Sequence, residues 1–393
     1  MYILYDVNLP EGFNLRRDVY IRAAVFLRNL IDNDTKYDWQ LVLPPWGNLY
    51  HWRSMNIGMQ KYIPWATFFD IVSLQKYIPV LEMYEFMKEY SVDRKEIVLD
   101  RVYFLQHDEN MFSAGKFVDK NEVASCPENN FPYRKINDKF AGRFWGYSNI
   151  TALEVKCIIF HGTTFGLMKN LKPSIHRSFM FDHMEIALHK EYGSVDYWMA
   201  RRSMRYNSEL YNVANEFRKK YLNSDDKKDN TERPDDWTME KGKRNAVGGQ
   251  YLAVHLRRRD FLMGRKDTVP TIKSAASQLK KKLKELKLET VFVATDAKDH
   301  EYEDLVTQLR NYTVIRFSPT DYIRTKFKDG GLAIIDQIIC SYARYFIGTY
   351  ESTFTFRIQE DREILGFLNE TTFNYLCGTK NKCETGGRWT IVW

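Results

Sequence analysis

The second half of the chain begins with a short apolar run, Gln250-Tyr251-Leu252-Ala253-Val254-His255, which is typical of a buried strand. Apolar residues then recur in steps of four and three, which predicts an amphipathic helix with its lysines in solvent. They are Ile272, Ala276, Leu279, Leu283 and Leu286. Further strands are predicted at 291–295, 313–317 and 345–349, and further helices at 301–310, 331–340 and 353–365. This alternation predicts a parallel sheet covered on both faces, a doubly wound, Rossmann-like domain.

The first half begins in the same way. A strand at residues 2–6 leads through a short loop into a helix. The apolar face of that helix consists of Leu15, Val19, Ala23, Phe26 and Leu30. Further strands are predicted at 39–43, 101–105 and 156–160, and residues 184–222 are predicted to be helical throughout. The first half is therefore also expected to be an α/β domain.

Residues 223–249 separate the two halves. They are rich in Asp, Lys and Asn and contain Pro234 and the pair Gly248-Gly249, which indicates a linker. The expected division is a first domain at 1–222, a linker at 223–249 and a second domain at 250–393. Two α/β domains that face each other across a linker form a cleft, and ligands bind outside the carboxyl ends of the strands.

Length and composition exclude several classes of protein. A chain of 393 residues suggests two domains, and its 9 Trp, 25 Tyr and 25 Phe exclude disorder. The 58 basic and 51 acidic residues leave a net charge of +7, which fits an anionic small ligand better than a nucleic acid. Only residues 280–287 approach the basic stripe that a nucleic acid requires. Because no run of 18 apolar residues occurs, no membrane span is expected.

The cysteines bear on the cellular compartment. The N-terminus has no secretory hydrophobic region, so the protein is either cytosolic or a mature chain whose leader has been removed. Cys377 and Cys383 close a short loop that a disulfide would staple, and Cys126 could pair with Cys157, which leaves Cys340 in a helix. This pattern favours the second alternative. Four N-glycosylation sequons support it, at Asn33, Asn149, Asn311 and Asn369.

The loop before the first helix is the first candidate site, Pro10-Glu11-Gly12-Phe13-Asn14. Gly12 permits a close approach of the backbone, and the free N–H groups at a helix start attract phosphate oxygens. A carboxylate such as Glu11 should repel an anion bound there. Its presence makes sense if the carboxylate has to meet a neutral hydroxyl next to a bound phosphate. Asn14 can also cap the helix. The alternative is an ordinary turn, in which Glu11 merely favours the positive helix end.

The second candidate site is His255-Leu256-Arg257-Arg258-Arg259-Asp260, directly after a strand. Arginines at the carboxyl end of a parallel strand match diphosphate oxygens in bidentate fashion. The alternative is a charged surface loop in which Arg259 pairs with Asp260.

Asp336 is the third candidate, because it lies on the otherwise apolar helix 331–340. A buried carboxylate there is costly unless it is hydrogen-bonded. The two adjacent donors of a guanine, N1–H and the amino group, would satisfy both of its oxygens. A helix cap or a backbone partner would do so equally well.

The fourth candidate follows a strand as well, Gly348-Thr349-Tyr350-Glu351-Ser352-Thr353-Phe354. Ser352 and Thr353 offer hydroxyl and N–H groups at a helix start, and Phe354 could stack on a base. The alternative is a simple capping sequence.

Several motifs are absent from the sequence. It contains no G-x-G-x-x-G, no G-x-x-x-x-G-K-[ST] and no G-x-S-x-G. The eight histidines show no metal-binding spacing, and Asp32-Asn33-Asp34 lies at a helix end, where a turn is expected. A bound diphosphate would therefore have to be neutralised by arginines and helix termini, and no metal ion or other cofactor is expected.

Four stretches resemble the protein O-fucosyltransferase 2 family, the GDP-fucose protein O-fucosyltransferases that act on thrombospondin type 1 repeats. The first is Asp6-Val7-Asn8-Leu9-Pro10-Glu11-Gly12-Phe13-Asn14-Leu15-Arg16-Arg17-Asp18. The others are Leu43-Pro44-Pro45-Trp46-Gly47, Asp329-Gly330-Gly331-Leu332-Ala333-Ile334-Ile335-Asp336-Gln337 and the shorter His255-Leu256-Arg257-Arg258. The likeness covers nearly the whole chain. The related enzyme that acts on epidermal-growth-factor-like repeats has an arginine-containing loop in place of Pro10-Glu11-Gly12, which favours the thrombospondin-repeat family.

The resemblance implies a GT-B fold, residence in the endoplasmic reticulum lumen and metal-independent, inverting transfer of fucose from GDP-fucose to Ser or Thr of folded thrombospondin type 1 repeats. It implies that Glu11 is the catalytic base, that Arg257 stabilises the departing GDP, and that disulfides join Cys126 to Cys157 and Cys377 to Cys383. The expected GDP-fucose contacts are Pro10, Gly12, Phe13, Asn14, His255, Leu256, Arg257, Asp336, Ser352, Thr353 and Phe354.

Two other functions remain open at this point. The first is a quality-control protein that grips folded repeats without transferring sugar, although Glu11 and Arg257 are both present. The second is a cytosolic nucleotide-sugar enzyme, which would have free thiols.

Overall fold

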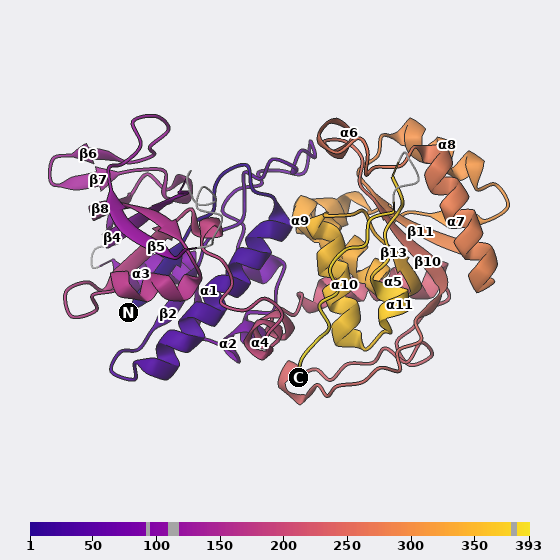
Figure 1. Ribbon diagram of the computed structural model, residues 1–393, viewed down its shortest axis with the longest axis horizontal. Helices are drawn as coiled ribbons and strands as arrows, with labels where there is room; N and C mark the ends of the chain where they lie inside the picture. Colours follow the sequence, from indigo (N-terminus) through magenta and orange to yellow (C-terminus); the bar gives the residue numbers. More distant parts are fainter. Residues whose placement is uncertain (92–94, 109–117, 379–382) are drawn as a thin grey trace. The chain divides into compact units, whose positions relative to one another are not determined.

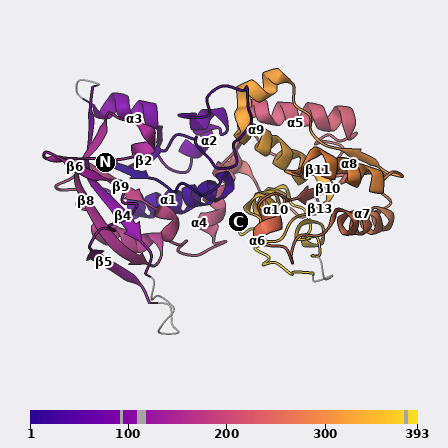
Figure 2. The same ribbon diagram turned by 90° about the horizontal axis from the view of Figure 1, so that it is seen from above.

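The computed structural model describes residues 1–91, 95–108, 118–378 and 383–393. They form two compact units, Met1–Arg205 and Tyr206–Trp393, and each unit contains its own sheet (Figures 1 and 2). No helix in this described part of the chain combines the length and the apolar character needed to cross a membrane.

The first unit is built on a nine-stranded sheet in the order β3-β2-β1-β9-β4-β8-β7-β6, with β5 also paired to β8. Six strands run parallel: β1 (Tyr2–Tyr5), β2 (Gln40–Leu43), β3 (Val80–Glu82), β4 (Ile97–Gln106), β8 (Ile150–His161) and β9 (Ser178–Asp182). Three are antiparallel: β5 (Lys120–Ala124), β6 (Arg134–Ile136) and β7 (Lys139–Ala141). The sheet is therefore a parallel core with an antiparallel extension that the sequence did not predict.

Helices pack against this sheet. The helices are α1 (Phe13–Asn33), α2 (Ile71–Gln75), α3 (Met83–Tyr90) and α4 (Val195–Ser203), with short 3₁₀ helices at Trp65–Thr67, Phe144–Gly146, Thr164–Asn170 and Met184–Ile186. Leu4 of β1 packs with Val42, Phe86, Val102 and Met180 in one buried cluster. Its neighbours Ile3 and Tyr5 are equally buried and point to the other face, as the period of a strand requires.

The second unit has a four-stranded, fully parallel sheet in the order β12-β11-β10-β13. Its strands are β10 (Gly249–Leu256), β11 (Thr290–Thr295), β12 (Thr313–Ile315) and β13 (Ala343–Ile347). Its helices are α5 (Ser208–Tyr221), α6 (Phe261–Gly264), α7 (Ile272–Leu286), α8 (Asp299–Gln308), α9 (Asp321–Ser341), α10 (Thr353–Leu365) and α11 (Asn369–Thr372), with a 3₁₀ helix at Trp237–Met239. The predicted alternation of strands and helices is confirmed.

Helices cover both faces of this second sheet (Figure 1). Leu252 and Val254 of β10 pack in one cluster with residues of α7 and α8. Tyr251 points the other way, and its hydroxyl donates to the carbonyl of Ile339 in α9 at 2.6 Å. Successive β10 side chains thus alternate between two helical layers.

The predicted continuous helix over 184–222 is wrong. The segment is divided into the 3₁₀ helix Met184–Ile186, α4 and α5. Ser194 begins α4 by accepting a hydrogen bond from the Tyr197 N–H, and Asn207 begins α5 in the same way with the Glu209 N–H. These N-caps start new helices where apolar spacing alone indicated one.

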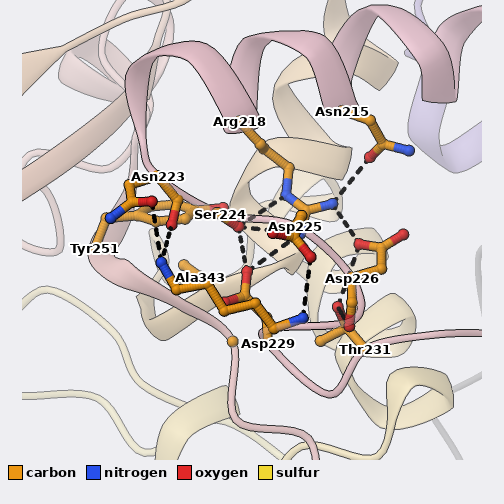
Figure 3. A network of polar contacts seen from close by, with 12 residues as sticks. Asn215, Arg218, Asn223, Ser224, Asp225, Asp226, Asp229, Thr231, Tyr251 and Ala343 are labelled. Carbon is orange, nitrogen blue, oxygen red and sulfur yellow. Dashed lines mark hydrogen bonds and ion pairs between the residues drawn. The ribbon is translucent and has the colours of Figure 1, made fainter.

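The division of the chain also differs from the expected boundary at residue 222. The first unit ends at Arg205, and residues 223–249 belong to the second unit. Buried Arg218 of α5 donates to Asp226 at 2.7 Å and to Ser224 at 3.1 Å, and the Ser224 hydroxyl donates to Asp229 (Figure 3). The main-chain carbonyl of Asp229 in turn accepts from the N–H groups of Val247 and Gly248. This polar network, together with buried Trp237, holds the charged segment on the unit.

Candidate active site

The strand order of the second sheet reverses at β10, which lies between β11 and β13. The chain leaves both β10 and β13 at this point, where parallel α/β sheets bind their ligands. Thr349 joins the two loops, because its hydroxyl accepts from the Arg257 N–H at 3.0 Å and donates to the His255 carbonyl at 2.8 Å. The structure therefore brings the second and fourth predicted sites together.

His255 is buried at the end of β10. Its Nδ1 lies 2.8 Å from the Thr355 hydroxyl, and its ring stacks on Phe354 with centroids 4.3 Å apart. Burial, with a smaller contribution from Arg257, lowers the pKa of His255 to about 3. The imidazole is therefore neutral at physiological pH and acts as a rigid support for the start of α10.

The three consecutive arginines have different environments. Arg257 makes ion pairs with Asp260 at 2.6 Å and Asp296 at 3.0 Å, which leave its half-buried guanidinium in a defined position. Arg258 is buried and forms an ion pair with Glu301 at 2.6 Å. Arg259 is exposed and donates to the Asp296 carbonyl rather than pairing with Asp260. Arg257 is thus the arginine of the cluster best placed to meet a ligand.

Asp336 lies on α9, and its Oδ1 atom is buried without a hydrogen-bond partner among the described residues. Burial raises the pKa of Asp336 to about 8. Neither the helix cap nor the backbone partner considered above satisfies this atom. An unpartnered buried carboxylate is costly, and a ligand with suitable donors would remove that cost.

Ser352 is the N-cap position of α10, but its side chain makes no capping hydrogen bond. The simple capping alternative is therefore wrong for this hydroxyl. Thr353 and Phe354 form the first turn of the helix. Leu256, by contrast, has its side chain in the core, and its carbonyl accepts from the Thr295 hydroxyl at 2.6 Å.

In the first unit, residues 6–12 connect β1 to α1 and are called the Glu11 loop below. The loop forms a turn in which the Glu11 N–H donates to the Asn8 carbonyl at 3.1 Å. Pro10 is exposed at its tip and Glu11 is half-buried. The Glu11 carboxylate has no hydrogen bond or ion pair within the described ranges. It is therefore available to a ligand.

Gly12, not Asn14, is the N-cap residue of α1. Asn14 instead accepts from Arg17 at 3.2 Å. Phe13 is buried against Trp46, with ring centroids 4.8 Å apart, so only its backbone is left for a ligand. The helix start consequently presents backbone N–H groups without a side-chain cap, as an anion site requires.

A matching family model supports a nucleotide-sugar site. The model for GDP-fucose protein O-fucosyltransferases matches residues 2–365. A Caenorhabditis elegans relative, GDP-fucose protein O-fucosyltransferase 2, is 46% identical over 399 residues, covering 100% of this chain and 90% of that protein. The Homo sapiens protein with the same description is 44% identical over 395 residues, with the same coverage. The chain belongs to the GDP-fucose protein O-fucosyltransferase family.

Its similarity to type 2 members over the full chain makes this enzyme a peptide O-fucosyltransferase that transfers fucose from GDP-fucose. A solved structure of POFUT1 in complex with GDP-fucose has a TM-score of 0.60 at 16% identity and covers 95% of this chain and 97% of that one. The two proteins share the α/β fold with parallel sheets.

The fucosyltransferase contains charged groups beside the Glu11 loop that sequence reasoning missed. Asp6 and Asp182 are buried at the ends of β1 and β9, and burial together with Asp182 raises the pKa of Asp6. Burial also raises the pKa of Glu185, whose Oε2 accepts from the Asn8 N–H at 3.1 Å. Glu185 is distant from Asn8 in sequence, so no local pattern identifies this contact.

The structure forms both disulfides that the resemblance implies, Cys126–Cys157 and Cys377–Cys383, and Cys340 is buried in α9. Among the sequons, Asn33 and Asn311 are exposed, whereas Asn149 and Asn369 are half-buried. The described residues include no group of three or more His, Cys, Asp or Glu side chains that could hold a metal ion.

Proposed function

We propose that this enzyme transfers fucose with inversion to Ser and Thr hydroxyls of folded thrombospondin type 1 repeats, and that Glu11 is the general base. The Glu11 carboxylate takes the proton of the acceptor hydroxyl while that oxygen attacks the anomeric carbon of fucose. The bond from this carbon to the phosphate oxygen breaks, and GDP leaves with the electron pair. The similarity to the type 2 relatives supports this choice of acceptor class.

The unpartnered Oδ1 of Asp336 is the observation that carries the assignment of the nucleotide. A guanine offers two adjacent donors, N1–H and the amino group, which pair with the two oxygens of one carboxylate. An adenine has no such pair of donors on that edge. Phe354, held from behind by His255, would pack on the base.

Arg257 and the start of α10 would hold the diphosphate. The guanidinium of Arg257 is fixed by Asp260 and Asp296, so it needs little reorganisation as charge grows on the leaving group. The side chain of Ser352 does not occupy the N–H groups of the first turn of α10, where phosphate oxygens bind well. In this mechanism no metal ion is required, and excess chelator should leave the transfer rate unchanged.

The base is tested by Glu11→Gln. Transfer to a folded thrombospondin type 1 repeat should fall by about 10²–10⁴-fold in kcat, whereas the Kd for GDP stays near that of the unmodified enzyme. Glu89→Gln, an exposed carboxylate on α3, is the matched control and should be fully active. Near-normal turnover of Glu11→Gln would exclude Glu11 as the base.

The endoplasmic reticulum lumen is the proposed compartment, because the two disulfides require an oxidising environment. Glycans are expected first on the exposed sequons Asn33 and Asn311. Mass spectrometry of the secretory-pathway protein before and after glycosidase treatment measures their occupancy.

A further inference from the structure

Arg16 lies in the first turn of α1 and is directed back onto the Glu11 loop. Its Nε donates to the Glu11 carbonyl at 3.0 Å, and its Nη2 donates to the carbonyls of Val7 at 3.1 Å and Asn8 at 3.0 Å. Its Nη1 also lies 3.5 Å from Oδ1 of Asp6. One side chain therefore contacts four residues of the loop.

The opposite side of the loop is fixed by the segment around Glu185. The Glu185 carboxylate accepts from the Asn8 N–H at 3.1 Å, and the Met184 N–H donates to the Asp6 carbonyl at 3.0 Å. Arg22 of α1 donates to the carbonyls of Glu185 and Ala187 at 2.9 and 2.8 Å. Helix α1 thus holds the loop directly through Arg16 and indirectly through Arg22.

The position of Arg16 needs a local reason. A basic side chain in the first turn of a helix opposes the helix dipole, and α1 has no acidic residue in that turn. Arg28, farther along the same helix, shows the ordinary alternative: it is exposed and pairs with Asp32 one turn away. In Arg16, by contrast, all three guanidinium nitrogens contact the loop that carries Glu11.

We propose that Arg16 is a positioning residue for Glu11, supported by Glu185. Arg16 ties the carbonyl of Glu11 to those of Val7 and Asn8, and this tie fixes the origin of the Glu11 side chain without using its carboxylate. The inference rests on the proposed role of Glu11 as base. A displaced base reduces the rate of the chemical step, because transfer depends on accurate geometry, but it leaves nucleotide binding by the second unit unchanged.

The test compares Arg16→Met, Arg16→Lys and Arg28→Met as full-length, disulfide-bonded enzymes. Arg16→Met should lower kcat by about 100-fold, with the KM for GDP-fucose and the Kd for GDP within about twofold of the unmodified enzyme. Arg16→Lys should recover part of the rate, because a single ammonium reaches fewer carbonyls than a guanidinium fork. Arg28→Met should be fully active.

Two further measurements separate positioning from folding. Millimolar guanidinium should restore part of the kcat of Arg16→Ala and none of that of Glu11→Gln. Glu185→Gln, which keeps an acceptor oxygen for the Asn8 N–H, should retain most of the activity, whereas Glu185→Leu should show the kcat defect. An unchanged kcat in Arg16→Met, or parallel losses of kcat, GDP affinity and thermal stability, would overturn the inference. If Glu11→Gln is fully active, the proposed base fails, whatever the Arg16 variants show.

Discussion

The Glu11 loop of the first unit and the loops after β10 and β13 of the second occupy the same topological position. The Glu11 loop follows β1, and the other two loops follow the neighbouring strands β10 and β13, in each case where the order of the sheet reverses. The second unit places a half-buried carboxyl group with one buried, unpartnered oxygen on α9 and a prearranged arginine after β10. The first unit instead leaves one half-buried carboxylate without a partner and fixes the backbone around it.

This difference indicates that the two units contribute differently to the reaction, the second to nucleotide binding and the first to the position of the base. In the second unit, unsatisfied polar groups would be satisfied by the nucleotide, so their energy goes into binding. In the first unit, Arg16 already pairs the loop carbonyls of Val7, Asn8 and Glu11, so the geometry of one side chain is defined. Variants of Arg16 and Glu11 should therefore change kcat, whereas variants of Arg257 and Asp336 should change the affinity for GDP as well.

Arg257→Ala should produce the largest effect in the second unit. Removing a fixed cation from the departing diphosphate should lower kcat/KM by about 10²–10³-fold and weaken GDP binding as well. Arg259→Ala is the matched control, because Arg259 is exposed and donates to the carbonyl of Asp296, in the loop after β11. Steady-state kinetics and calorimetric titration with GDP measure both quantities. If Arg257→Ala and Arg259→Ala lost kcat/KM and GDP affinity equally, the diphosphate would be bound by the arginine cluster as a whole and not by Arg257 in particular.

Asp336→Asn should lower GDP affinity by about 10–100-fold at pH 8, because hydrogen bonds to a charged group are lost. The pKa of Asp336 is raised to about 8 by burial, so the empty site holds a proton at pH 7. Guanine donors favour the ionised form, so binding should release close to one proton at pH 7 and should weaken by about tenfold per pH unit below pH 8.

Calorimetry in two buffers with different ionisation enthalpies measures the released proton. Asp336→Asn should abolish the release, and Asp321→Asn, an exposed residue at the start of the same helix, should not. Proton-neutral, pH-independent binding by the unmodified enzyme would contradict direct contact between guanine and this carboxylate.

The two regions also differ in how far the sequence predicts them. Strand and helix spacing predicted β10 and α10, and the cost of a carboxylate on an apolar helix made Asp336 a candidate. The same reasoning did not separate Arg257 from Arg258, because their roles depend on Asp296 and Glu301, which lie on other elements. In the first unit, Glu11 stood out as an acid at a helix start.

Long-range polar contacts account for what the sequence did not predict. The charged composition of residues 223–249 indicated a linker, yet buried Arg218 and Asp229 hold that segment on the second unit. Glu185 reaches Asn8 across 177 residues of sequence. Apolar periodicity reports which face of an element is buried, but it carries no information about which charged groups meet.

The smallest expected effect concerns His255, the buried residue that supports Phe354 at the start of α10. The pKa of His255 is lowered to about 3 in the folded state, so the unfolded chain takes up a proton near pH 6.5 that the folded chain does not. This group therefore contributes no pH dependence above pH 6.5, and its own contribution to stability should fall by about 1.4 kcal/mol per pH unit as the pH falls from 6.5 toward 3. Urea unfolding at pH 6.5, 5.5 and 4.5 measures the slope.

His255→Gln should reduce the pH slope of the unfolding free energy, whereas His300→Gln, at an exposed position on α8, should leave it in place. If both variants keep the slope, His255 does not determine the acid sensitivity of folding, which would contradict a buried, neutral imidazole beneath Phe354.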